Sequence, residues 1–114
     1  MSPLLAPPLS PQVFQILLSL VDGSDRHGYA ILRDVEVRTG GEIRLTASTL
    51  YAAIKRMLDA GLIAEVDAPG ETGGAPRRCY RIRKAGRDLA RAEAERLARA
   101  VSMARDKRLL PGKA

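Results

Sequence analysis

The sequence predicts a mainly α-helical domain that carries one small β-hairpin. Three segments place apolar residues at helical spacing, two later segments are predicted strands on either side of a Gly- and Pro-rich stretch, and a long alanine-rich segment follows. The 114 residues suffice for one domain with one modest core. Because aromatic residues make up only 4% of the chain, that core must consist of Leu, Ile, Val and Ala.

Composition divides the chain into four parts. We expect residues 1–9, which are rich in proline, to form a flexible arm. Residues 10–83 hold the short helices and the hairpin, residues 84–109 form one long helix, and residues 110–114 form a frayed tail.

The first helix is predicted to begin after Ser10, an N-cap followed by Pro11, and to run to about Val21. It carries two apolar stripes, one with Val13, Ile16, Leu17 and Leu20 and a second with Phe14, Leu18 and Val21. A helix that is apolar on two sides must be covered on two sides. The second stripe therefore indicates either a partner subunit or a later helix of the same chain.

A turn at 22–25 leads through Arg26-His27-Gly28-Tyr29 into a second helix, which ends at Gly40-Gly41. A lone histidine in a turn is typically a packing or capping group, and we interpret His27 in that way. Residues 42–45 could form a short strand.

The segment Thr46–Gly61 predicts a third helix with Thr46 as N-cap and Gly61 as its stop. Leu50, Ile54, Met57 and Leu58 form its buried stripe. The opposite side carries Ser48, Thr49, Tyr51, Ala52, Lys55 and Arg56. Small hydrogen-bonding groups followed by cations suit a helix that reads bases and holds phosphates in the DNA major groove. An ordinary amphipathic surface helix is the alternative.

Residues 62–67 and 77–83 are predicted strands of a hairpin whose loop is 68–76. Residues 77–84 contain five cations and no acid, namely Arg77, Arg78, Arg81, Arg83 and Lys84. A basic hairpin directly after a recognition helix is typical of the wing of a winged helix-turn-helix, with its tip at the minor groove or the adjacent phosphates. A solvated charge run on an edge strand is the alternative.

The last helix, from Lys84 or Ala85 to about Leu109, carries a seam of mostly small residues at alternating spacings of four and three. The seam consists of Ala90, Ala94, Leu97, Val101 and Ala104. A long isolated helix is marginal in water. We therefore expect it to pair with its own copy or with the first helix of a second subunit, in a homodimer.

Charge favours a polyanionic partner, since the net charge is +6 and the isoelectric point is about 10.1. Four basic and five acidic residues give 1–45 a net charge of −1, seven and four give 46–84 a charge of +3, and eight and four give 85–114 a charge of +4.

We expect no signal peptide, no membrane span, no metal site and no cofactor, and the single cysteine fits a reducing cytoplasm. Strand alternation places Cys79 outward beside Arg78 and Arg81, where it is either a redox-sensitive thiol or simply a small residue.

Five short motifs in order resemble those of PadR-type transcriptional regulators, over about residues 8–104. They are Ile16-Leu17-Leu18-Ser19-Leu20, Arg26-His27-Gly28-Tyr29-Ala30-Ile31, Thr49-Leu50-Tyr51 with Lys55-Arg56, Gly61-Leu62-Ile63, and Arg78-Cys79-Tyr80-Arg81-Ile82 with Gly86. The resemblance implies a homodimeric winged-helix repressor that binds an inverted repeat in double-stranded DNA. It also implies dimer contacts through the first and last helices, DNA contacts by Thr49, Tyr51 and Lys55, and a wing that includes Arg77 and Arg78.

The chain departs from the family pattern at Cys79, where an aromatic is usual, and at Arg83, where a threonine usually caps the last helix. Some relatives hold flat aromatic drugs between tryptophans at the dimer interface, and we do not expect that pocket in a chain that has no Trp and only Phe14. A small-molecule effector, if there is one, is not identified by the sequence. The competing hypotheses are a winged-helix module that binds another protein without DNA, and an enzyme, for which we find no catalytic constellation.

Overall fold

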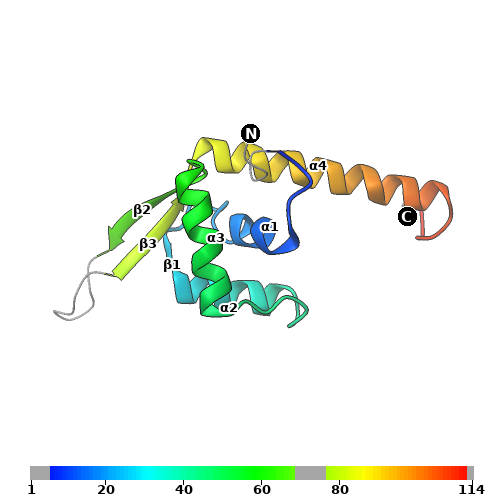
Figure 1. The fold of residues 1–114 in the computed structure, drawn as a ribbon. Coiled ribbons are helices and arrows are strands. Elements are labelled where there is room, and N and C mark those ends of the chain that lie inside the picture. Colours follow the sequence, from blue (N-terminus) through cyan, green and yellow to red (C-terminus); the bar gives the residue numbers. More distant parts are fainter. Residues whose placement is uncertain (1–5, 69–76, 113–114) are drawn as a thin grey trace.

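The computed structural model describes residues 6–68 and 77–112 and confirms a four-helix fold with a small sheet and a long last helix (Figure 1). The elements in chain order are α1 Pro11–Leu18, β1 Arg26–His27, α2 Gly28–Arg38, α3 Ala47–Asp59, β2 Ile63–Ala68, β3 Arg77–Ile82 and α4 Lys84–Asp106. The expected hairpin loop and minor-groove tip fall mostly on residues 69–76, outside the described residues. The side chains of Ala68 and Arg77 are likewise outside the description.

The sheet has three antiparallel strands in the order β1-β3-β2, so the hairpin gains a strand that the sequence did not indicate. That strand is only two residues long and pairs Arg26 with Tyr80 and His27 with Cys79. A segment this short carries no alternation to detect. Our prediction of a strand at 42–45 was wrong, since those residues form bends and irregular chain leading into α3.

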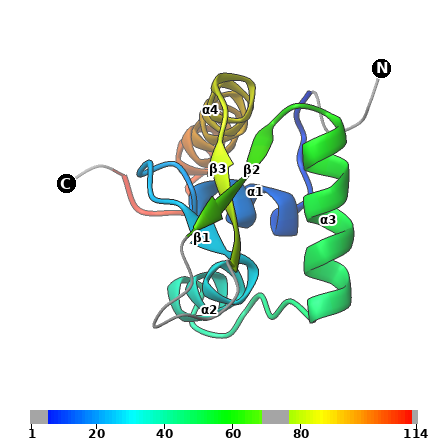
Figure 2. The ribbon, with the colours of Figure 1, turned by 90° about the vertical axis from the view of Figure 1, so that its left-hand side faces the viewer.

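A single apolar core lies between α1, α2, α3, the sheet and the first turns of α4. Its largest fully buried side chains are Ile16, Leu17, Leu20, Ile31, Val35, Leu50, Ile54, Met57, Leu62 and Ile63. Aliphatic residues dominate it, as the scarcity of aromatic residues predicts. Figure 2 shows α3 along one side of the molecule and α4 along another, with the sheet between them.

Side-chain caps fix where the helices begin. The oxygens of Ser10 and Thr46 accept from backbone N–H groups three residues later, as predicted, and His27 Nδ1 does the same for Ala30 N, which confirms its capping role. An N-cap of this kind is typically worth about 1 kcal/mol. At the other end of α3, Gly61 takes a φ of +74°, and Leu62 N donates to Met57 O. Only glycine adopts that backbone without strain.

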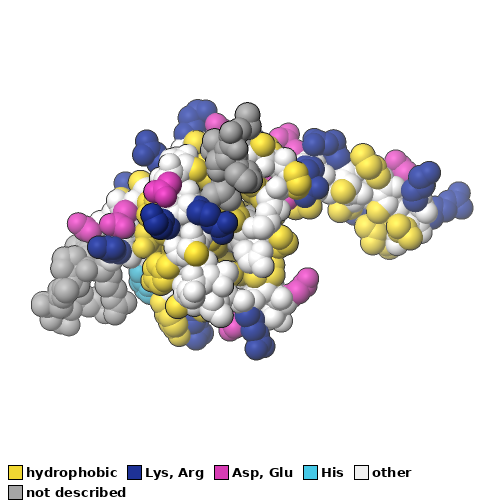
Figure 3. Space-filling model, viewed as in Figure 1, with side chains coloured by type: hydrophobic (Ala, Val, Ile, Leu, Met, Phe, Trp, Pro, Cys, Tyr) yellow, Lys and Arg dark blue, Asp and Glu magenta, His cyan; other side chains and the backbone are white. Residues whose placement is uncertain are grey.

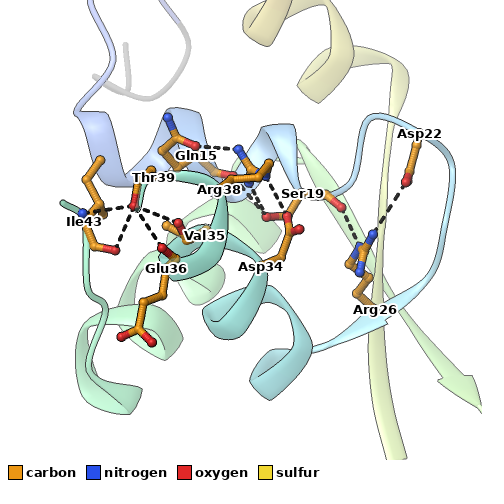
Figure 4. A network of polar contacts seen from close by, with 10 residues as sticks. All are labelled: Gln15, Ser19, Asp22, Arg26, Asp34, Val35, Glu36, Arg38, Thr39 and Ile43. Atoms are coloured by element: carbon orange, nitrogen blue, oxygen red, sulfur yellow. Dashed lines mark hydrogen bonds and ion pairs between the residues drawn. The ribbon is translucent and has the colours of Figure 1, made fainter. Parts of the chain in front are cut away.

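Helix α1 ends at Leu18, three residues before the predicted end, because the chain tightens into a turn there. Ser19, 2% exposed, donates its hydroxyl to Gln15 O and accepts from the Arg38 guanidinium. Arg38 also reaches the Gln15 side chain and backbone and pairs with Asp34, so one cation joins α1 to α2 (Figure 4). Figure 4 also shows the Thr39 hydroxyl in contact with the Val35, Glu36 and Ile43 backbones, which holds the turn after α2.

Helix α4 crosses the domain at Gly86, where a methyl group would collide with the backbone carbonyl of Leu62. Arg83 N donates to the same carbonyl at 2.9 Å. The start of α4 is therefore fixed by a close backbone approach that only glycine permits. Arg83 is the N-cap residue but makes no side-chain cap hydrogen bond.

The first half of α4 packs on α1, whereas the second half extends beyond the domain (Figure 1). The end of the proline-rich arm also packs here. Leu9 is buried, contrary to our prediction that the flexible arm extends to it, and its N–H donates to the Glu93 carboxylate. The chain after α4 is not simply frayed either: Leu109 N donates to Ala104 O, and Arg105 holds the Pro111 carbonyl at 3.0 Å.

Glu93 is the one charged side chain buried in the described part of the chain, at 2% exposure. It accepts two hydrogen bonds from Arg96, each 2.8 Å long, and one from Leu9 N. The Arg96 hydrogen bonds hold the pKa of this carboxyl below its usual range against the opposing effect of burial, with Leu9 N helping. The ionised form therefore stabilises the contact between the arm and α4.

We predict that Glu93→Gln lowers the free energy of unfolding at pH 7 by about 2 kcal/mol, the usual contribution of hydrogen bonds to a charged group. Since the pKa is lowered in the folded state, the wild-type advantage is full above the unfolded carboxyl pKa, about 4.5. It falls away as pH drops through the lower folded pKa. Urea unfolding of both proteins from pH 7 to pH 3 measures this, with Glu95→Gln as an exposed control on the same helix. A difference that persists unchanged at pH 3 would contradict the ion-pair explanation.

Candidate nucleic-acid interface

Helix α3 presents the predicted contact residues on its exposed side. Its buried stripe, Leu50, Ala53, Ile54 and Met57, faces the core. Leu58, predicted in that stripe, is only half-buried. The exposed side carries Ser48, Thr49, Tyr51, Lys55 and Arg56, and Figure 3 shows basic side chains gathered over α3. Burial on one side leaves this polar and basic side free for a partner.

The first turn of α3 holds its hydroxyl groups in place. Thr46 Oγ1 accepts from Thr49 N and donates to Thr49 Oγ1 at 2.9 Å. The Thr49 hydroxyl thus accepts within the protein and keeps its own hydrogen for an outside acceptor. Lys55 makes only a loose, exposed ion pair with Asp59 at 3.6 Å, so its charge is also available.

Tyr51 does more than face outward. A methyl group on Gly28, the first residue of α2, would collide with the Tyr51 hydroxyl and ring. One side of the ring therefore lies on the Gly28 backbone, while 49% of the residue stays exposed. Gly28 and Tyr51 were both singled out in the sequence as family motifs, but not as a contact. The Tyr51 ring thus spans from α3 to the start of α2.

A hollow of about 510 Å³ opens beside this contact, between α2, α3 and β3. It is lined by His27, Gly28, Tyr29, Tyr51, Arg78 and Tyr80. All three tyrosines of the chain meet here, from segments about 20 to 50 positions apart in sequence. The structure thus joins two predicted residues, Tyr51 and Arg78, and adds His27, Tyr29 and Tyr80, which we had not assigned to a site. The motif Arg26-His27-Gly28-Tyr29 was the only signal that could have indicated them.

Arg81, one of the predicted wing arginines, does not line this hollow. Arg77 begins β3, and its side chain lies outside the description. Arg81 makes a bidentate pair with Asp25, at 2.8 and 2.7 Å, and these hydrogen bonds raise its pKa. Side chains alternate along a strand, so Arg81 and Arg78 lie on opposite faces of β3. The fold uses Arg81 to tie the sheet to the turn before β1.

Cys79 is buried, which corrects our prediction that it points outward to solvent. Alternation places Cys79 on the same strand face as the exposed Arg81, so the burial of Cys79 comes from its small side chain and from its neighbours on the two adjoining strands. His27 of β1 and Val66 of β2 lie directly opposite Cys79 on either side. A small, covered thiol fits its packing role and removes the basis for a redox-sensitive site.

The residues predicted at the dimer interface differ in how far the subunit itself covers them. Ala90 is already buried within the subunit, and Leu18 lines a shallow groove of about 210 Å³ between α1 and α4 with Ala90 and Ala94. Phe14, packed on the core, and Ala104 are half-buried. Leu97 and Val101, each 37% exposed, lie on the half of α4 that extends beyond the domain, where Figure 3 shows hydrophobic side chains gathered.

The model of the transcriptional regulator PadR-like family matches residues 17–92 of this chain, from α1 into α4. The chain belongs to the PadR-like family. An uncharacterized protein X from Lysinibacillus sphaericus is 32% identical over 72 residues, which span 63% of this chain and 65% of that protein, just under two thirds of its length.

Solved PadR structures share the fold. The crystal structure of a PadR family transcription regulator from hypervirulent Clostridium difficile superposes with a TM-score of 0.72 at 24% identity, over 85% of this chain and 97% of that one. Bacillus subtilis PadR, crystallised in complex with operator DNA, gives a TM-score of 0.61 at 20% identity, over 69% and 44% of the two chains. The resemblance seen in the motifs is confirmed.

Membership of this family makes the PadR-like chain a transcriptional regulator, as predicted, and not an enzyme. In the described ranges, no helix is long and apolar enough to cross a membrane. Within the same residues, 6–68 and 77–112, no group of three His, Cys, Asp or Glu side chains could hold a metal ion.

We predict that Gly28→Ala destabilises this PadR-like protein by less than about 1 kcal/mol, because the added carbon meets only the outer end of the Tyr51 ring, a half-exposed side chain that can move aside. In a Tyr51→Ala background the collision is absent, so the same change should be neutral or stabilising, as Gly→Ala usually is in a helix. Chemical denaturation of the four proteins of this double-mutant cycle measures the difference. Equal effects of Gly28→Ala in both backgrounds would show that the Tyr51 contact does not require glycine.

Proposed function

We propose that this PadR-like chain represses transcription by occupying an inverted-repeat operator as a homodimer. The observation that carries the proposal is the exposed side of α3, where hydroxyl groups at the amino end precede Lys55 and Arg56. That order matches a helix whose first residues contact base edges in the major groove while later cations contact phosphates. The neighbouring hollow adds Arg78 from the sheet on the same side.

Specificity in this proposal comes from the first turns of α3. Ser48, Thr49 and Tyr51 contact or position against bases, and Thr49 has a hydroxyl hydrogen to donate. Lys55, Arg56, Arg77 and Arg78 neutralise phosphates in any sequence. Arg81, which sequence reasoning also placed at the DNA, would have to leave Asp25 to take part, so we omit it from the interface.

Dimerisation through α1 and α4 would place two copies of α3 in successive major grooves, about one helical turn apart. The groove between α1 and α4 and the exposed seam on distal α4 supply the apolar surface for this. Operator occupancy by such a dimer blocks a promoter sterically. A winged helix that binds only another protein would not need the cations of α3 and β3.

We predict a strong salt dependence of DNA binding. If a dimer makes roughly six to ten phosphate contacts, affinity should fall about a thousandfold or more between about 50 and 200 mM salt. Lys55→Ala should weaken selected and random duplexes alike and reduce the slope, whereas Thr49→Ala should reduce the preference for the selected site. Fluorescence anisotropy with a duplex selected from a random pool measures both. A flat salt response would contradict DNA binding by this surface.

We predict that Leu97→Glu and Val101→Glu each convert the protein to a monomer and lower operator affinity, because a charge would be buried in the seam. Met103→Glu is the matched control, since Met103 is also exposed and apolar but projects from the opposite side of α4. Analytical ultracentrifugation gives the oligomeric state, and circular dichroism checks the fold. A wild-type protein that is monomeric at micromolar concentration would contradict the proposed dimer.

A further inference from the structure

The hollow beside Tyr51 has the features of a binding site rather than of a packing gap. We call it the tyrosine notch, defined by its lining residues His27, Gly28, Tyr29, Tyr51, Arg78 and Tyr80. Three of these, Tyr29, Tyr51 and Arg78, are exposed, so the notch opens to the surface next to α3. Among the residues that the structure describes, none closes the notch off from a partner that approaches α3.

Tyr80 points to an occupant. The residue is only 3% exposed, yet its hydroxyl has no hydrogen-bond partner among the residues that the structure describes. In that part of the chain no fully buried side-chain polar atom lacks a partner, so the hydroxyl must reach the notch. In the free protein this hydroxyl can bond water in the notch, and it can exchange that water for an acceptor on a ligand.

The notch is built to donate. Burial, together with the nearby Tyr51 hydroxyl and Glu65 carboxylate, raises the pKa of Tyr80, so the phenol keeps its proton at neutral pH. The amino end of α2, an 11-residue helix capped by His27, begins at the wall of the notch and carries a partial positive charge. Arg78 adds a full charge, held only by a loose, largely exposed pair with Glu65 at 3.7 Å. These donors favour an anion, which must displace the Glu65 carboxylate from Arg78, since Glu65 lies opposite Tyr80 on β2.

We infer that the tyrosine notch holds one phosphate of the DNA backbone in each half-site, with Tyr80 donating to a phosphate oxygen beside Arg78. The inference rests on the proposed DNA binding and adds a contact from residues that the sequence did not assign. A backbone phosphate suits the notch better than a free anion, because the notch adjoins the very residue, Tyr51, that faces the bases. A phosphate fixed there sets the register of α3 in its groove.

Tyr80→Phe tests the inference, since it removes only the hydroxyl. Binding to a duplex selected from a random pool should weaken about a hundredfold, because the dimer loses one hydrogen bond to a charged group in each half-site and each is worth about tenfold, and random duplexes should lose a similar factor. Thermal unfolding should be unchanged, and Tyr29→Phe at the exposed rim provides a second variant with a smaller loss expected. If Tyr80→Phe bound DNA with wild-type affinity, the phosphate contact in the notch would be contradicted and the proposed function would stand. If the wild type bound no duplex, the proposed function itself would be rejected.

Neutral methylphosphonate linkages placed singly along the selected duplex locate the contact. At one linkage in each half-site, the neutral group should reduce the DNA affinity of Tyr80→Phe less than that of the wild type. At every other linkage it should reduce the affinity of both proteins equally. Equal losses everywhere would overturn a direct contact. Inorganic phosphate at constant ionic strength separates the sources: it should compete with DNA no better than chloride. If phosphate displaced DNA from the wild type but not from Tyr80→Phe, and no linkage gave a smaller loss in the variant, the notch would bind a free anion and not a DNA phosphate.

Discussion

The packing of one side of α3 into the core is the constraint on which the rest of the surface depends. Leu50, Ile54 and Met57 are almost completely buried, so the helix cannot rotate without exposing them to water. Because side chains on a helix have fixed angular positions, burying this stripe also fixes where Thr49 and Lys55 point. The apolar residues of α3 therefore aim its polar residues, although they touch no partner themselves.

Contacts between segments distant in the sequence help to position these elements relative to one another. The Tyr51 ring lies on Gly28, the Arg81 guanidinium holds Asp25, and the Gly86 backbone approaches Leu62. Each contact joins two elements at a point where a small change in side-chain volume or charge would move one against the other. Together they hold α2, α3 and the sheet as one surface, which is what a partner as rigid as a DNA duplex requires.

Helix α4 has two halves with different surroundings. Its first half is covered by α1 and by the arm that reaches Glu93, and it completes the core. Its second half carries Leu97 and Val101 at moderate exposure, beyond the domain. The same helix thus closes the subunit and offers a surface to a second one, so the proposed dimer and the fold share a single element.

The sequence by itself determined the elements whose cause is local. Apolar spacing predicted α1, α3 and α4, and the caps at Ser10, Thr46 and Gly61 appear where they were predicted, because each depends on residues within about one turn. The sequence also shows the basic composition of residues 77–84 and the order of the family motifs. The predicted ends of α1 and α4 were about three residues too late.

Only the tertiary structure decided which distant residues meet. Strand β1 exists because β3 is there to pair with it, and the same pairing turns Cys79 from an exposed residue into a covered one. The tyrosine notch brings together segments about 20 to 50 residues apart, and the Leu9 contact with Glu93 spans 84 positions. Periodicity records only which side of an element is apolar. What covers that side, and which polar groups end up beside one another, follows from the packing of the whole chain.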